Sequence, residues 1–207
     1  MIKYRNQFNY QIEENMMKLD LERISEKDIG YLIGLYIGDG YSNYNKKDRH
    51  YTVEFYLNSL KDIDIQQNLI VLLKKISLNP YIYKDKRYNV NRIRVRSKKF
   101  MNFIKKRSKI FNSLSDEYKI GLISGFIDAE GWVTKGEIMV TQKDKEVLTK
   151  FKEICESFDI FRKMWPSYNI KSKGPVWRLR ISTKFKYLPH NSYKVKRIYS
   201  GVGQDFK

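Results

Sequence analysis

The 207-residue sequence has little of what disulfide-linked, zinc-binding or membrane proteins need. Its single cysteine, Cys155, excludes a disulfide within the chain. The chain has only two histidines, so a structural zinc site, which needs about four N or S ligands, is not expected. No run approaches the ~20 apolar residues of a membrane helix, and the N-terminus has no apolar segment typical of a signal peptide. We therefore expect no membrane partner and a soluble protein inside the cell. If the source is an archaeon or a bacterium, we expect the protein in the cytoplasm, and the matrix of an organelle is the alternative location.

Positive charge, by contrast, is abundant. The 41 Lys and Arg residues outnumber the 23 Asp and Glu residues, which gives a net charge of +18 and a pI near 9.7. Such an excess attracts polyanions, and the pI falls in the range of nucleic-acid binders. A basic protein without a specific partner remains the alternative on charge alone. The 42% hydrophobic fraction is enough for a packed core.

Two segments of the chain resemble each other. Residues 31–40 align with residues 122–131 when Asp39 is matched to Glu130. The alignment then pairs Gly34 with Gly125, Gly38 with Ala129, and Gly40 with Gly131. Further along, residues 92–98 parallel residues 178–184, so the two halves share one plan.

Hydrophobic periodicity predicts the same elements in each half. In the first half we expect a helix from about residue 25 to 39, a hairpin over 41–58, a helix over 61–76, a hairpin over 81–97 and a helix over 98–111. In the second half we expect a helix over 115–130, strands to 142, a helix over 144–158 and strands to 182. The prediction is an α+β fold with an αββαββα unit used twice. Residues 1–24 form an N-terminal extension, 25–112 the first half, and 113–207 the second half with a basic C-terminal tail.

Small residues occupy one face of each repeated helix, because Gly34 and Gly38, and likewise Gly125 and Ala129, are four positions apart. Such spacing lets two helix backbones approach closely, so we expect these helices to pack on each other. Asp39 and Glu130 would then lie together at the helix C-termini, where the helix dipoles and mutual repulsion disfavour carboxylates. A divalent cation relieves both penalties, and carboxylate oxygens suit Mg²⁺. Gly40 and Gly131 are expected as left-handed C-caps. Two ordinary buried helices that end in Asp-Gly and Glu-Gly turns are the alternative, which the matched pairs disfavour.

The segments Leu32–Gly40 and Ile123–Gly131 resemble the nine-residue motif of the LAGLIDADG homing endonucleases, of the single-chain, two-motif type found in archaeal introns. The resemblance implies two pseudo-symmetric halves with the motif helices at the central interface and antiparallel sheets that form a DNA-binding saddle. It also implies that Asp39 and Glu130, at the eighth place, bind Mg²⁺ or Mn²⁺, with the carbonyls of Gly38 and Ala129 as further ligands. The sixth place holds Ile37 in one copy and Asp128 in the other, and it varies in the family.

The resemblance also marks polar residues at strand ends as catalytic. In the second half these are Gln142 and Lys143, for which a polar helix N-terminus is the alternative. In the first half Asn58 stands in the place of the glutamine, and no lysine is in register. The two active sites are therefore expected to be unequal.

Arginines alternate along two predicted strands. Arg92, Arg94 and Arg96 share one strand face, as do Arg178 and Arg180, with apolar residues opposite. Such rows repel themselves unless a polyanion covers them, and arginine on a β-ribbon can read guanine in the major groove. Basic residues in loops are expected to reach phosphates, although a charged loop alone is more often only solvated; they are Lys46, Lys47, Arg49, Lys84, Lys86, Arg87, Lys135, Lys171 and Lys173.

The resemblance implies a monomeric, site-specific homing endonuclease that binds a long duplex DNA site and hydrolyses both strands to leave a staggered break, as in intron homing. The metal would activate water and stabilise the leaving oxygen. No serine or cysteine has a histidine at recognisable spacing, so nothing favours nucleophilic catalysis. A maturase that binds intron RNA is the main alternative. A DNA-binding regulator without activity is the third, and the intact acids count against it.

Overall fold

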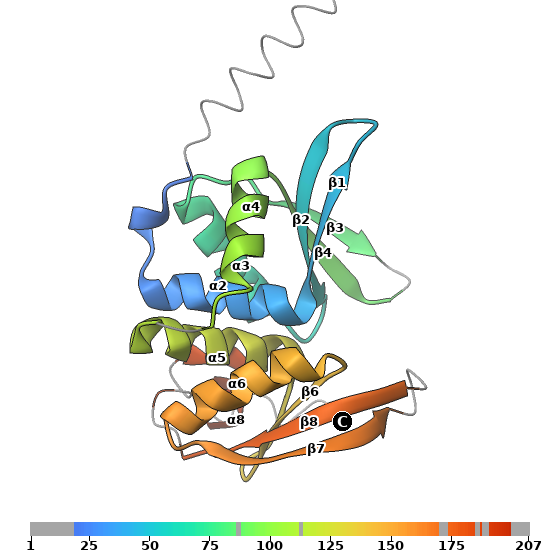
Figure 1. The fold of residues 1–207 in the computed structure, drawn as a ribbon. Coiled ribbons are helices and arrows are strands. Elements are labelled where there is room, and N and C mark those ends of the chain that lie inside the picture. The colour runs from blue at the N-terminus through green and yellow to red at the C-terminus, as the bar shows by residue number, and fades with distance from the viewer. Residues whose placement is uncertain are drawn as a thin grey trace, which may run out of the picture. The chain divides into compact units, whose positions relative to one another are not determined.

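The computed structural model describes residues 19–85, 88–111, 114–169, 174–184, 187 and 191–199. Lys86, Arg87, Lys171, Lys173 and most of the predicted N-terminal extension lie outside these residues. The first half runs through η1 (Leu21–Arg23), α2 (Glu26–Asp39), β1 (Gly40–Asn45), β2 (His50–Asn58), α3 (Ile63–Lys75), β3 (Tyr81–Asp85), β4 (Val90–Arg96) and α4 (Lys98–Arg107). The second half runs through α5 (Asp116–Glu130), β5 (Gly131–Val133), β6 (Ile138–Gln142), α6 (Lys145–Ser157), β7 (Phe161–Asn169), β8 (Gly174–Ile181) and α8 (Tyr193–Tyr199) (Figure 1).

Both halves contain a four-stranded antiparallel sheet of the same topology. The strand order is β1-β2-β4-β3 in the first sheet and β5-β6-β8-β7 in the second. In each half the motif helix leads directly into the first strand, at Gly40 and at Gly131. The α+β class and the repeated αββαββα plan predicted from periodicity are therefore confirmed.

The compact units of the structure do not follow the repeat. Among the residues that the structure describes, one unit contains those up to residue 25 and those in 40–106, and the other contains residues 26–39 and those from 107 onward. The first motif helix, α2, thus groups with the second half of the chain, in contrast to the predicted boundary near residue 112. The reason is its partner: α2 packs along α5, beside which it lies in Figure 1.

Each unit has a core that matches its apolar pattern. In the first, Val53, Phe55 and Ile93 are fully buried on one face of the sheet, as are Leu69 and Leu73 on α3. In the second, α6 packs on β6 and β8, and the ring of its Phe151 stacks on Phe126 of α5 at 3.8 Å between centroids. Cys155 is buried in this core as predicted, and burial raises the pKa of its thiol. None of the helices in the described ranges is long and apolar enough to cross a membrane.

The segment expected to be a basic tail contains the packed helix α8. It lies against α5 and β5, and Val195 between its lysines is fully buried. The αββαββα plan implies a closing helix in the second half, but seven residues are too few to give a clear helical period, so the sequence pattern did not locate it. Its position brings new side chains to the end of α5.

Candidate metal centre and nucleic-acid interface

The seam between α2 and α5 is a contact of backbone against backbone. A Cβ atom built on Gly34 would lie 2.3 Å from the carbonyl oxygen of Leu122, and one built on Gly125 would lie 2.2 Å from that of Tyr31. Gly30 and Gly121 continue the seam one turn toward the N-termini, where a Cβ would lie 2.1 Å and 1.9 Å from a carbonyl oxygen. Sequence reasoning missed these two, although both continue the four-residue spacing. Only glycine fits at such positions, because a carbon cannot approach a carbonyl oxygen this closely.

The seam ends at the two acids. A Cβ on Gly38 would lie 2.3 Å from the Cβ of Ala129 and 3.0 Å from Cγ of Glu130. The side chain of Glu130 therefore lies against the residue that precedes Asp39. The structure brings the two motif acids together at the C-terminal ends of α2 and α5.

Gly131 does not have the expected left-handed conformation. Its φ is −81° and its ψ is 141°, which is extended backbone that leads into β5. A Cβ at this position would instead lie 2.4 Å from the carbonyl oxygen of Ile127. Glycine is required here by the close turn from helix to strand and not by a positive φ.

Burial and like charge act together on Glu130. Burial, and after it the negative charge of Asp39, raise the pKa of its carboxyl to about 7. The ammonium of Lys194 and a hydrogen bond from Gln142 oppose it. Two carboxyl groups that repel each other in a poorly hydrated place form a site that a cation stabilises.

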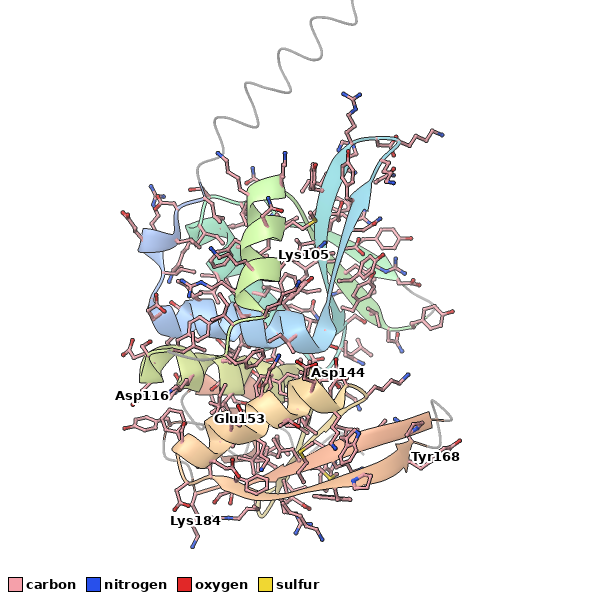
Figure 2. The ribbon with its side chains drawn as sticks, in the orientation of Figure 1. Lys105, Asp116, Asp144, Glu153, Tyr168 and Lys184 are labelled. Atoms are coloured by element: carbon pink, nitrogen blue, oxygen red, sulfur yellow. The ribbon has the colours of Figure 1, made fainter. Side chains whose placement is uncertain are left out.

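Of the residues predicted to be catalytic, Gln142 reaches this site. It is the last residue of β6, and its Nε2 donates to Oε1 of Glu130 over a long 3.4 Å. Lys143 is exposed, and its backbone N–H donates to Oε1 of Gln142. The next residue, Asp144, caps α6, at whose start it is labelled in Figure 2. The segment from Gln142 to Asp144 therefore forms the polar start of α6 and also contacts Glu130 through Gln142.

Asn58 holds the matching place at the end of β2. Its Oδ1 accepts hydrogen bonds from the backbone N–H groups of Leu60 and Lys61, and its carbonyl accepts from Nε2 of Gln66. These contacts shape the turn that leads into α3. These hydrogen bonds give the side chain of Asn58 a structural role within the first compact unit.

A buried network that sequence reasoning missed lies beside Glu130. Asp128, fully buried, accepts from the hydroxyls of Tyr31 and Ser192 at 2.8 and 2.7 Å and from the backbone N–H groups of Tyr193 and Lys194 at 2.9 Å each. Burial raises the pKa of its carboxyl, and these four hydrogen bonds oppose the rise. A charged residue inside the apolar run of α5 was the signal that could have identified it.

The donor set at the helix ends fits a hard divalent cation. Two carboxylates and main-chain carbonyls are oxygen ligands of the kind that Mg²⁺ and Mn²⁺ prefer. Within the described ranges no cluster of three or more His, Cys, Asp or Glu side chains could hold a metal, so water or substrate oxygens would complete the shell. The ammonium of Lys194 already lies 3.0 Å from the carbonyl oxygen of Ala129, which shows that this place attracts positive charge.

On the outer face of the first sheet, two of the three arginines already have carboxylate partners. Arg92 pairs with the buried Asp85 at 2.8 Å, and Nε of Arg94 pairs with the buried Glu54. The prediction that this row repels itself unless a polyanion covers it is therefore wrong for Arg92 and Arg94. Arg96, at the end of the row, is exposed. Tyrosines that sequence reasoning did not select accompany the row, namely the exposed Tyr41, Tyr81 and Tyr83.

The second sheet carries the same mixture on its own outer face. Arg180 pairs with Glu137, and its guanidinium lies 5.8 Å from the ring centre of Trp165. Arg178 stands opposite Thr141 of β6 and Trp165 of β7. Both sheets thus present arginine with aromatic rings, a combination suited to bases as well as phosphates.

The predicted phosphate contacts are surface residues where the structure describes them. Lys46, Lys47 and Arg49 in the β1-β2 turn, Lys84 on β3, and Lys135 in the β5-β6 turn are all exposed. Arg49 has a positive φ of 54°, which the tight turn requires.

Comparisons with known proteins agree with this architecture. Residues 117–187 match the family model of the LAGLIDADG-like domain. An uncharacterized protein of Methanocaldococcus jannaschii is 28% identical over 136 residues, which are 64% of this chain and 49% of that protein. The chain therefore spans about half the length of this curated relative.

Solved structures share the fold at low identity. The homing endonuclease I-DmoI in complex with DNA and Ca is 21% identical, with a TM-score of 0.65 over 84% of this chain and 88% of that one. The N-terminal LAGLIDADG domain of DUF199/WhiA is 14% identical, with a TM-score of 0.57 over 94% of this chain and 90% of that one. Residues 117–187 are thus similar to the LAGLIDADG-like domain, and the chain shares its fold with I-DmoI and with the LAGLIDADG domain of DUF199/WhiA.

Proposed function

We propose that this protein is a site-specific DNA endonuclease that cuts both strands of a long duplex site as a monomer, with a divalent metal ion such as Mg²⁺ or Mn²⁺. The observation that carries the proposal is the pairing of Asp39 and Glu130 at the ends of two glycine-packed helices. An isolated Asp-Gly turn needs no such partner, whereas two acids held together at a buried seam need a cation. That I-DmoI was solved bound to DNA supports the proposal.

The chain supplies oxygen ligands from both motifs. Asp39 and Glu130 would hold the metal with their carboxylates, and the carbonyls of Gly38 and Ala129 lie at the same helix ends. When bound, a divalent ion supplies charge stabilisation for the phosphate and a more acidic water. Gln142 orients the carboxylate of Glu130 through its amide. One acid from each motif suits one cut per strand, and thus a staggered break.

The sheets carry the binding surface of the proposal. Arginines and aromatic rings on antiparallel strands fit the major groove of B-DNA, which is wide enough for a β-ribbon. Exposed lysines in the strand turns suit phosphate contacts, which position the protein without reading sequence.

The decisive experiment is selection followed by cleavage. A pool of random duplexes is enriched for binding to the purified protein without metal, and the selected duplex is then incubated with Mg²⁺. The parent should cut both strands, while Asp39→Asn and Glu130→Gln should bind with nearly unchanged affinity and make no double-strand break. Either single variant is expected to retain at most nicking of one strand.

Three other outcomes would overturn the proposal. Double-strand cleavage by the variant that carries both substitutions would remove the assigned acids from the reaction. Tight binding to intron RNA, with no cut in the selected duplex, would favour the maturase. Selection of a specific duplex that is never cut would favour a DNA-binding regulator.

A further inference from the structure

Helix α8 brings a lysine to the second acid. Nζ of Lys194 donates to the carbonyl oxygens of Ala129 and Gly131 at 3.0 and 3.1 Å. These two residues flank Glu130 in the chain. Carbonyls at a helix C-terminus lack helical partners and carry the negative end of the dipole, so a cation is stabilised there. The ammonium of Lys194 therefore occupies a position in which these carbonyl oxygens could instead bind a metal ion.

The backbone of the same lysine is fixed as well. Its N–H donates to Oδ1 of Asp128, which also accepts from the hydroxyl of Ser192, while the N–H of Tyr193 donates to Oδ2. Val195, the next residue, is fully buried. Because Asp128 and Ala129 are neighbours on α5, one segment holds both ends of Lys194. The ammonium is thus built into the site and is not the end of a freely moving surface side chain.

We propose that the ammonium of Lys194 is the resident counterion of the second motif, and that a divalent cation must displace it from the Ala129 carbonyl in order to bind beside Glu130. The inference rests on the proposed function and names a residue that regulates the metal site. Two cations at one oxygen repel each other, so the two occupants exclude one another. Lys194 lowers the affinity of the free protein for metal while it stabilises the metal-free fold.

The arrangement belongs to the second motif. At the place that matches Asp128, the first motif has Ile37, whose side chain has no acceptor to hold the start of a helix. Glu130 therefore has a helix and a lysine held next to it by Asp128, and the first motif has no residue that could hold such a helix in the same way. A comparison of the nine-residue motifs alone does not reveal this difference.

The test measures Mn²⁺ affinity of the full chain without DNA, by calorimetric titration and by the rise in melting temperature with Mn²⁺. Lys194→Met keeps the aliphatic stem and removes the charge. It should bind Mn²⁺ at least about fivefold more tightly than the parent, the lower end of typical coupling between two sites. Lys194→Arg retains a cation and should stay close to the parent.

A matched control removes the same charge from the same helix. Lys196 is exposed on α8, and Lys196→Met should leave Mn²⁺ affinity unchanged. Adding Glu130→Gln to Lys194→Met should abolish the gain, because the ligand that benefits from it is gone. If Lys194→Met melts too low for the assay, Lys194→Gln keeps a hydrogen-bond donor without charge and is compared in the same way.

Equal or weaker Mn²⁺ binding by the uncharged variants overturns the inference. So does a melting experiment in which Mn²⁺ raises the melting temperature of parent and variant equally, or of neither. A weaker affinity would make Lys194 a structural support of the site. Failure here is separate from failure of the proposed function, since a parent that cuts DNA with Mg²⁺ but shows no gain on Lys194→Met loses only the counterion role.

Discussion

At the scale of single residues, Glu130 is held in an environment that its ionised form does not favour. The carboxyl is poorly hydrated and faces Asp39, and both effects favour the protonated form. Functional sites often contain groups with such shifted pKa values, because a bound ligand supplies the stabilisation of charge that the protein alone does not. The cost should be measurable in the metal-free protein.

Replacement of Glu130 by Gln should stabilise the metal-free protein at alkaline pH. A folded-state pKa of about 7 against an ordinary 4.5 means that the carboxyl favours folding below pH 4.5 and loses that contribution as pH rises through 7. At about 1.4 kcal/mol per pKa unit, the parent loses at most about 3 kcal/mol by pH 8. Melting with a chelator at several pH values should show a higher melting temperature for Glu130→Gln at pH 8, fading toward pH 4.5. A gain independent of pH would assign the effect to packing.

Arg94 and Arg96 should respond differently to substitution by alanine. Arg94 neutralises the buried Glu54, so Arg94→Ala leaves a buried carboxylate short of one partner and should cost about 1–3 kcal/mol of stability. Arg96 is exposed, so Arg96→Ala should melt within about 0.5 kcal/mol of the parent and still weaken DNA binding. Thermal melts and gel-shift titrations measure the two effects. Parent-like DNA affinity of Arg96→Ala would argue against this face as the interface.

At the scale of elements, the seam of α2 and α5 depends on four glycines that no other residue can replace. A glycine inside a helix destabilises it by about 1 kcal/mol relative to alanine, so the close backbone contact must stabilise the fold by more than this cost. These four are Gly30, Gly34, Gly121 and Gly125. A Cβ at each would meet backbone atoms of the opposite helix, carbonyl oxygens above all, and not flexible side chains. The seam therefore cannot yield by a rotamer change.

Gly121→Ala should destabilise the protein far more than Gly136→Ala. The first Cβ would lie 1.9 Å from the carbonyl oxygen of Lys27, whereas the second meets nothing within 4 Å. Overpacking typically costs about 1–3 kcal/mol, and a clash with backbone belongs at the upper end or beyond. Chemical denaturation of both variants provides the measurement, with Gly136→Ala within about 0.5 kcal/mol of the parent. Similar stabilities for the two would show that the helices do not meet at Gly121.

At the scale of the whole molecule, the proposed function assigns two tasks. The net charge of +18 would supply affinity for any nucleic acid, while the strand faces would select duplex DNA over RNA. A-form RNA has a deep, narrow major groove that strand side chains cannot read. Preference for duplex DNA is therefore expected from the sheets and not from the charge.

Binding to the selected duplex should be strongly salt-dependent and should resist RNA competitors. If about six or more phosphates are contacted, affinity should fall roughly a thousandfold or more between about 50 and 200 mM salt. Lys47→Ala should weaken binding to selected and random duplexes alike, because it lies in an exposed turn suited to phosphate. Fluorescence anisotropy over a salt series gives both slopes. Displacement of the duplex by an equal amount of structured RNA would contradict this expectation.

The amino-acid sequence by itself determined the repeated plan. Two acids matched in register, small residues four apart and alternating strands were enough to predict both sheets, the paired helices and the motif acids. These features are local, since helix and strand periods depend on residues a few positions apart. Gln142 was selected by the family resemblance and not by periodicity, and the structure places it at the end of β6, beside Glu130.

Only the tertiary structure decided which distant groups meet. Lys194 lies 64 positions after Glu130 in a helix of only seven residues, yet it contacts the carbonyls on either side of that acid. The carboxylate partners of Arg92 and Arg94 likewise come from neighbouring strands, and α2 joins the second unit because its glycines fit α5. Such pairings depend on packing and on the burial of charge, which no short stretch of sequence records. The balance of charges at the site is for that reason a property of the fold.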